Sequence, residues 1–229
     1  MKDKSSILFV LLPVVAVVIL AVVAVVVSRG PAVPQEEALL VRADDHVKGS
    51  AGAPVTIIEF ADFQCPGCAG FAPLVSQLQQ QYGEDLRVVF RHFPLTSIHQ
   101  NAIVAAQAAE AASMQGKFWE MHDKLFTGQQ TWAALQDPLT VFRQYAEELE
   151  LHMDTFEKDY ASTEVQDRIR TDLRMAQSFG LTGTPTFFVN GEQIETPSDY
   201  ASFSAIIDKA LGGDQAAVEV PVFQVKEAN

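Results

Sequence analysis

Cysteine is nearly absent from this sequence, since Cys65 and Cys68 are the only two among 229 residues. Two thiols cannot form the set of disulfides that staples a small secreted scaffold, nor the four-thiolate site of a zinc module. A mixed zinc site is disfavoured as well, because no pair of the five histidines stands at the usual spacing behind the cysteines. We therefore predict a redox pair and no metal there.

Positive charge is also scarce, with 16 Lys and Arg against 29 Asp and Glu and a formal net charge of −13. So acidic a chain repels phosphate backbones, which argues against nucleic acid as a partner. Internal repeats and low-complexity tracts are absent too. The remaining composition, 48% hydrophobic and 20% charged, is that of an ordinary globular domain.

Long hydrophobic runs are missing except at Ile7 to Val27, which contains no charged residue. A helix of that length crosses the roughly 30 Å core of a bilayer. Lys2 and Lys4 precede the run and only Arg29 follows closely, so the positive-inside rule puts the N-terminus in the cytoplasm. We therefore expect a cytoplasmic tip over 1–6, a single-pass anchor in the cell membrane, and an extracytoplasmic domain in a compartment where disulfides persist.

A cleaved secretory signal is the alternative to an anchor at residues 7–27. A signal requires a cleavage site of small residues, and the nearest candidate, Val22-Val23-Ala24, lies inside the apolar run, so we favour the anchor. Residues 28–53 are interpreted as a linker with a short strand or turn near Leu39 to Val41. Residues 213–229 form a tail to which we assign no structure.

Around the cysteines, the apolar pattern predicts a strand, a helix and a second strand. Val55 to Phe60 is apolar on both faces, which is typical of a central strand parallel to its neighbour. A helical stripe follows the cysteines and ends at Gly83. Leu86 to Phe93 is a second strand that Pro94 ends. Together they form a βαβ unit.

A block of helices follows and is interpreted as an insertion over about 97–180. Its members are predicted over His99 to Gln115, Lys117 to Phe126, Asp137 to Leu149 and Thr163 to Gly180. Asp137 and Pro138 are expected at the cap and first turn of the third helix, and Thr163 with Gln166 resembles a capping box that opens the fourth.

A hairpin and a final helix close the domain. Thr186 to Val189 and Gln193 to Glu195 are predicted to pair across the turn signal Asn190-Gly191. Thr196 and Pro197 are predicted to start the last helix, which ends near Leu211. The order βαβ, helices, ββα predicts an α/β domain over 54–212.

This order, with Cys65-Pro66-Gly67-Cys68 at the first strand-to-helix junction and Thr184-Pro185 before the hairpin, resembles the thioredoxin fold with its central mixed sheet. The chain is similar, more narrowly, to the DsbA family of extracytoplasmic thiol–disulfide oxidoreductases, including membrane-anchored, BdbD-like members. The segments that carry the likeness are Glu59 to Gln64, Phe90 to Leu95, Gly116 to Asp123 and Gly183 to Gly191. The best-known DsbA proteins carry Pro-His between the cysteines, so the Pro66-Gly67 of this chain implies a milder oxidant.

The chemistry of the pair follows from its place at the start of a helix. Cys65 then occupies the N-cap and Pro66 the first helical position, where a missing N–H costs nothing. The free amides of Gly67 and Cys68 and the helix dipole stabilise a Cys65 thiolate and lower its pKa. A substrate thiolate would attack the Cys65 sulfur of the disulfide, and the less exposed Cys68 would leave.

Glu59 shares a strand face with Val55 and Ile57. Burial there would raise the pKa of its carboxyl and let it exchange a proton with Cys68. A strand-end glutamate reaching solvent is the alternative that the residues alone leave open. The resemblance favours the proton-handling role, because DsbA proteins carry a buried acid at the matching position.

Thr184-Pro185 matches the loop of the family that contains a cis-proline and faces the cysteines. Only about 5–6% of X-Pro bonds in folded proteins are cis, so the residues alone would predict trans, and the resemblance reverses that expectation. The backbone groups of Thr184 could then pair with an extended substrate segment as an added strand.

The resemblance implies an enzyme that introduces disulfides into reduced or unfolded exported proteins through Cys65 and Cys68. It further implies reoxidation by a membrane partner of the DsbB or VKOR type that passes electrons to quinone, and no bound cofactor. A reductase or isomerase of the same fold, and a non-catalytic binding or chaperone module, remain as alternatives. We expect the following to be surface or packing residues and assign them no role: His92, His99 and His122. Asp62 is left unassigned.

Overall fold

The computed structural model describes residues 39–212. The segments predicted as a cytoplasmic tip, an anchor at 7–27, the first part of the linker and the tail at 213–229 lie outside the described residues. Within 39–212, no helix combines the length and the apolar character needed to cross a membrane.

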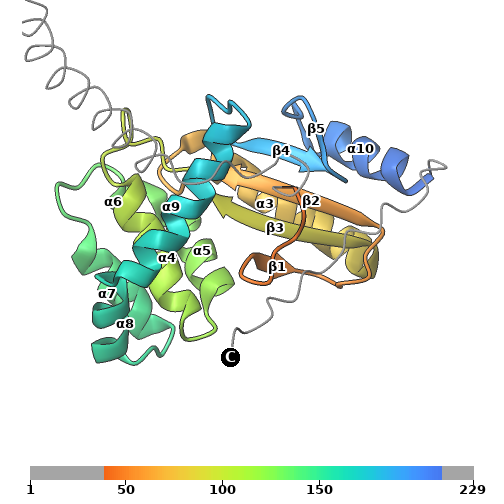
Figure 1. Cartoon of the computed structure of the whole chain (residues 1–229). Coiled ribbons are helices and arrows are strands. Elements are labelled where there is room, and N and C mark those ends of the chain that lie inside the picture. The colour runs from red at the N-terminus through yellow and green to blue at the C-terminus, as the bar shows by residue number, and fades with distance from the viewer. Residues whose placement is uncertain (1–38, 213–229) are drawn as a thin grey trace, which may run out of the picture. The chain divides into compact units, whose positions relative to one another are not determined.

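A five-stranded mixed sheet forms the centre of the domain, in the order β1-β3-β2-β4-β5 (Figure 1). The strands are β1 (His46–Lys48), β2 (Val55–Ala61), β3 (Leu86–His92), β4 (Thr186–Val189) and β5 (Glu192–Gln193). β2 runs parallel to β3, while β1 pairs with β3, and β4 with β2 and β5, in antiparallel fashion. The predicted central strand and its parallel partner are confirmed.

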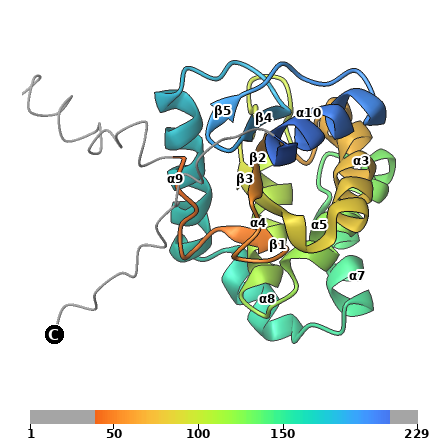
Figure 2. The same cartoon turned by 90° about the vertical axis from the view of Figure 1, so that its right-hand side faces the viewer.

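Every residue of β2 and β3 is buried, because helices cover both faces of the sheet. On one face, Ile57 packs with Leu78 of α3 (Pro66–Tyr82) and Phe203 of α10 (Tyr200–Gly212). On the other face, Ile58 packs with Met175 of α9 (Thr163–Ser178). Figure 2 shows α3 and α9 on opposite sides of the strands. This packing explains why the pattern of β2 has no polar face.

Helices between β3 and β4 form the insertion beside the sheet (Figure 1). Before α9 come α4 (Ala102–Ser113), α5 (Phe118–Thr127), α6 (Gln129–Trp132), α7 (Leu139–Glu148) and α8 (Met153–Tyr160). They share one core with the cysteines, which contains the buried alanines of α4 together with Met121, Trp132, Phe142 and Phe156. The short helices α6 and α8 were not predicted.

The first strand lies at His46–Lys48, and Leu39 lies in a turn, so of the strand or turn predicted near Leu39 to Val41 the turn is correct. A turn follows at Arg42 to Asp45, where the amide of Arg42 donates to the carboxylate of Asp45 at 2.8 Å and the amide of Asp45 donates to the Arg42 carbonyl at 3.2 Å. Part of the segment predicted as a linker therefore belongs to the sheet.

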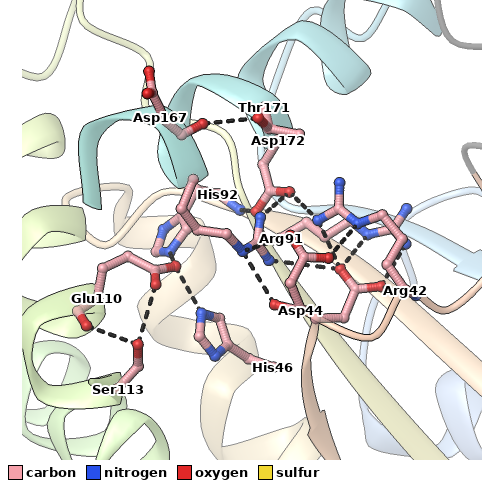
Figure 3. A network of polar contacts seen from close by, with 12 residues as sticks. Arg42, Asp44, His46, Arg91, His92, Glu110, Ser113, Asp167, Thr171 and Asp172 are labelled. Carbon is pink, nitrogen blue, oxygen red and sulfur yellow. Dashed lines mark hydrogen bonds and ion pairs between the residues drawn. The ribbon is translucent and has the colours of Figure 1, made fainter. Parts of the chain in front are cut away.

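A buried ion network holds that turn to the sheet and to α9 (Figure 3). Arg91 on β3 donates from Nη2 to Asp45 Oδ2 at 2.7 Å, and both side chains are fully buried. Arg42 bridges Asp45 and Asp172 of α9 at 2.9 and 2.6 Å. Arg168 pairs with Asp172 at 2.5 Å. Each buried charge thus faces a charge of opposite sign, as a low-dielectric interior requires.

Two helices of the insertion begin differently from the prediction. Pro138 is the N-cap of α7, and the Asp137 carboxylate still accepts from the Leu139 amide at 3.0 Å. In α9 the N-cap is Ser162, whose hydroxyl accepts from the Val165 amide at 3.2 Å. The predicted capping box of Thr163 is therefore wrong by one residue, because the serine before it satisfies the same amides.

The hairpin and the last helix are also displaced. The return strand is Glu192–Gln193 and not Gln193 to Glu195, because it pairs directly across the Asn190-Gly191 turn. The last helix begins at Tyr200, since Asp199 accepts from the Ser202 amide at 2.8 Å and takes the role predicted for Thr196. The rest of the βαβ, helices, ββα order is as predicted.

Candidate active site

The two cysteines lie at the start of α3, directly after the central strand. Cys65 is the N-cap, with an extended backbone (φ −71°, ψ 122°), and Pro66 takes the first helical position. The amide of Cys65 donates to the Asp62 carbonyl at 3.0 Å, which turns the chain sharply from β2 into the helix. Both cysteines are free thiols. The helix therefore directs its unpaired amides toward the first sulfur.

The surroundings of Cys65 favour its thiolate and lower the pKa from its ordinary value to about 5. The largest contribution is a hydrogen bond from the Cys68 thiol, which outweighs the opposing effect of burial. Thr184 and the amides of Cys68 and Gly67 lower the pKa further. The Cys65 sulfur also lies 3.4 Å from the Thr184 carbonyl, to which the protonated thiol donates. Cys65 is therefore ionised at neutral pH.

Cys68 has the opposite character. Its side chain is fully buried, and burial strongly raises its pKa. The hydrogen bond to Cys65 and the charge of Glu59 raise the pKa further, although the Asp62 amide donates to the sulfur at 3.5 Å. The pair thus consists of one stable thiolate near the surface and one thiol in the interior that is costly to ionise.

Glu59 is buried on β2, and its side-chain Oε1 has no hydrogen-bond partner. Burial raises the pKa of its carboxyl to about 8. The alternative of a strand-end glutamate that reaches solvent is therefore wrong. A cavity of about 20 Å³ borders Glu59, and Lys48, His122 and Asp123 also line it. That volume holds one water molecule, which could connect the carboxyl with polar groups nearer the surface.

The loop before β4 lies against the cysteines. Its Thr184–Pro185 peptide bond is cis, as the resemblance implies. A Cβ atom at Gly67 would lie 3.4 Å from Pro185 Cδ and 3.5 Å from the Cys65 sulfur, so the helix start and the loop are in close contact. A pocket of about 360 Å³ extends along this loop from Phe179 to Thr186. The pocket borders Thr184, whose carbonyl lies 3.4 Å from the Cys65 sulfur, and Cys65 is itself largely buried, with 9% of its surface exposed.

The fold therefore brings every predicted site residue to the start of α3. It adds Asp62, which is buried and accepts from the Gln64 amide at 2.7 Å, from the Leu95 amide at 2.8 Å and from His99 Nδ1 at 2.8 Å. Asp62 thus ties the loop before Cys65 to the segment that follows β3. His99, for which the sequence predicts no role, is thus a hydrogen-bond partner of Asp62.

Gln129 is a second addition. Its side-chain amide donates to the carbonyls of Phe63 at 2.8 Å and Cys65 at 3.0 Å, so α6 holds the backbone at the first cysteine. The sequence carried no signal for this contact, because a helix of four residues has no periodicity. Of the other histidines, His122 is a buried packing residue with Asp123 as its partner, as expected.

Comparisons with known proteins agree with this geometry. Residues 42–209 match the model of a thioredoxin family. Among solved structures, the chain is similar to α-DsbA1 of Wolbachia pipientis, with 25% identity, coverage of 78% of this chain and 96% of that one, and a TM-score of 0.70. A thioredoxin-like oxidoreductase of Silicibacter pomeroyi is 26% identical over 75% and 94% of the two chains, with a TM-score of 0.63. BdbD of Bacillus subtilis, at 24% identity and a TM-score of 0.66, shares the fold over 74% of this chain and 94% of its own.

Curated relatives match over part of their length only. The Na(+)/H(+) antiporter NhaA 3 of Salinispora tropica is 43% identical over 167 residues, which are 73% of this chain and 25% of the antiporter. The chain thus spans about a quarter of the length of the curated relatives it matches. The name antiporter belongs to those whole proteins, of which this chain matches only a part.

Proposed function

Because the chain belongs to the thioredoxin family and is a DsbA-like thiol–disulfide oxidoreductase, we propose that it acts as an oxidant of exported proteins. Its Cys65–Cys68 disulfide would be transferred to reduced or unfolded clients outside the cytoplasm. The observation that carries this direction is the contrast between the two sulfurs, in which Cys65 has a pKa of about 5 while burial holds Cys68 as a thiol.

In the first step, a client thiolate attacks the Cys65 sulfur. A client–Cys65 disulfide forms, the Cys65–Cys68 bond breaks, and the electron pair of that bond goes to Cys68. The Cys68 thiolate is strongly basic in its buried position and takes a proton from the Glu59 carboxyl, whose pKa of about 8 keeps it protonated at neutral pH. Water in the adjoining cavity then returns a proton to Glu59.

In the second step, another client thiolate attacks the client sulfur of the mixed disulfide. The client disulfide forms and Cys65 leaves as the thiolate that its surroundings stabilise. The client has lost two electrons and the enzyme has gained them. Because the released thiolate is stable, the reaction favours client oxidation. The Thr184–Pro185 loop and its pocket would hold the client mainly through backbone groups.

We infer from the pKa of Cys65 that the reduction potential lies between those of thioredoxin and the best-known DsbA. Thioredoxin has a cysteine pKa of about 7 and a potential of about −270 mV. Two further pKa units of thiolate stabilisation at about 30 mV each give roughly −210 mV. The chain would then be a milder oxidant than the best-known DsbA, at about −120 mV.

Each turnover leaves a dithiol that another protein must oxidise again. We infer a quinone-linked membrane partner of the DsbB or VKOR type. A single-pass anchor at residues 7–27 would keep the domain near that partner, on the outer side of the membrane. Protease treatment of intact spheroplasts tests this location, because an outward-facing domain is digested without lysis and an inward-facing domain is not.

The direction of electron flow is tested by equilibrating the full chain with glutathione and measuring its dithiol fraction. A potential near −210 mV supports the proposal, whereas a value at or below about −270 mV would identify a reductase. Oxidised protein is also mixed with a reduced, unfolded client, and client disulfides are counted. Cys65→Ser should abolish their formation, while the exposed control Thr155→Ala on α8 should not. Full activity without Cys65 would favour a binding or chaperone module.

A further inference from the structure

A second cluster of functional side chains lies where the sheet meets the insertion. His46 belongs to β1, His92 ends β3 and Glu110 lies on α4. The Nε2 atoms of His46 and His92 lie 2.6 and 2.7 Å from the same atom, Oε1 of Glu110. Figure 3 shows the carboxylate between the two rings. Among the described residues 39–212, these three side chains are the one set of possible metal ligands whose nitrogen, sulfur or oxygen ligand atoms all lie within 4.8 Å of one another.

The surrounding packing holds these three side chains in place. The ring of His46 is stacked on Phe118, with 3.4 Å between the centroids and 4° between the planes. The ring of His92 stands edge-on to Phe90 at 5.3 Å. The second oxygen of Glu110 accepts from the Ser113 hydroxyl at 3.2 Å. The ligand atoms are therefore pre-oriented, which lowers the entropic cost of binding an ion.

The charges around the cluster suit a cation. Glu110 is 3% exposed, and both residues that face its Oε1 are imidazoles, which bind metal ions in their neutral form. A pocket of about 380 Å³ reaches His46 and Glu110 from the surface, and its other charged lining residues are Asp44, Glu164, Asp167 and Arg168. Arg168 is the one cation among these, and it is paired with Asp172 at 2.5 Å. The pocket thus gives an ion a path and leaves space for a water ligand.

We propose that His46, His92 and Glu110 bind one divalent transition-metal ion, with zinc as the best match. Two imidazole nitrogens, one carboxylate oxygen and an open position are a recurrent zinc ligand set, whereas calcium and magnesium select oxygen ligands. Zinc bonds of about 2.0–2.1 Å place tetrahedral ligand atoms about 3.3 Å apart. The nitrogens would therefore move roughly 0.6 Å away from the carboxylate oxygen, within the reach of small side-chain rotations.

Such an ion would connect three elements that are distant in the sequence, namely β1, the end of β3 and α4. It would clamp the insertion to the sheet without touching the two sulfurs. This site is independent of the redox function. It departs from the sequence-based prediction that the chain binds no metal, because the fold and not the spacing of the residues assembles the ligands.

The test uses the full chain purified without a histidine tag, with Cys65 and Cys68 held as a disulfide so that no thiolate can bind metal. Titration with Co²⁺ should give visible d–d bands of a low-symmetry site at one ion per chain, without the near-ultraviolet band of a thiolate ligand. Calorimetric titration with Zn²⁺ should give the same stoichiometry.

His46→Ala and Glu110→Gln should weaken zinc binding by more than the roughly 10- to 100-fold that the loss of an outer-shell partner costs. The control His152→Ala removes an exposed imidazole at the start of α8 and should bind as the wild type does. Near-ultraviolet circular dichroism shows which variants are folded. If Glu110→Gln is unfolded, the test rests on His46→Ala, because His46 is the most exposed of the three residues.

Thermal unfolding provides an independent measurement. Zinc at a free concentration of about 100 times Kd should raise the melting temperature of the wild type by roughly 5–10 °C and leave His46→Ala unchanged. Absence of binding to the wild type, or equal binding by the wild type and folded His46→Ala, would overturn the proposal and leave the three residues as a hydrogen-bonded network.

Discussion

Replacing Glu59 by glutamine tests the buried carboxyl through its effect on stability. Burial raises the pKa of Glu59 from an ordinary 4.5 to about 8, so the folded protein binds this proton far more tightly than the unfolded chain does. The contribution of Glu59 to the stability of the fold is therefore greatest below pH 4.5 and is lost as the pH rises toward 8. The slope is about 1.4 kcal/mol per pH unit, which gives about 5 kcal/mol over the whole interval. Glutamine has the same shape and does not titrate.

The measurement needs the protein with the Cys65–Cys68 disulfide formed, because in the reduced protein the ionisation of Cys65 changes stability with pH in the opposite direction to Glu59. The pKa of Cys65 is lowered to about 5, so its ionisation makes the reduced protein more stable as the pH rises from 5 toward 9. In the disulfide form Cys65 does not titrate, and burial, the cause of the Glu59 shift, is unchanged. Urea unfolding followed by tryptophan fluorescence then gives the free energy of unfolding at pH 5.0 and 7.5.

Between those two pH values, the stability of the wild type should fall by about 3 kcal/mol relative to Glu59→Gln. Any constant difference between the side chains cancels in this comparison. The exposed control Glu147→Gln on α7 should change nothing between the two pH values. If the difference between the wild type and Glu59→Gln is the same at both pH values, burial does not hold this proton and the proposed proton transfer fails.

Three further changes test the surroundings of the sulfurs and the ion network. Cys68→Ala removes the largest contribution to the low pKa of Cys65, so the midpoint of its alkylation rate against pH should rise from about 5 yet stay below that of a free thiol, because the helix amides remain. Gly67→His places an imidazole beside the Cys65 sulfur, where there is space for a Cβ. The reduction potential, measured against glutathione, should rise by about 30 mV for each tenfold gain in thiolate stability. An unchanged or lower reduction potential would contradict this. Asp45→Ala removes the fully buried carboxylate that accepts from Arg91 and Arg42 and should lower the free energy of unfolding in urea by about 3–5 kcal/mol. A loss below about 1 kcal/mol would refute the importance of these pairs.

The sequence predicts best those elements whose signal is local. The central strand and α3 are found because an apolar run, a proline at the first helical position and a glycine with φ of 52° after the last turn mark their limits. The sequence does not locate β1, because this strand has three residues and its position depends on pairing with β3 and on the Arg42–Asp45 turn. Helices α6 and α8 are missed because four and eight residues give little periodicity.

The same distinction holds for the site. The positions of Cys65 and Pro66 follow from the rules of helix capping, and the depth at which Glu59 is buried follows only from its neighbours in the sheet. The contacts of Gln129 and the meeting of His46 with Glu110 join residues 64 apart in the chain. No short-range pattern encodes such distances, so these features require the folded structure.

The two hydrogen bonds from Gln129 to the carbonyls of Phe63 and Cys65 have a consequence for how the backbone at the first cysteine is held. The amide that holds the reactive backbone comes from a four-residue helix of the insertion, in which Gln130 and Thr131 are exposed. The backbone at the first cysteine is therefore held from outside the motif, so a change in α6 would move this backbone while the four residues of the motif stay the same.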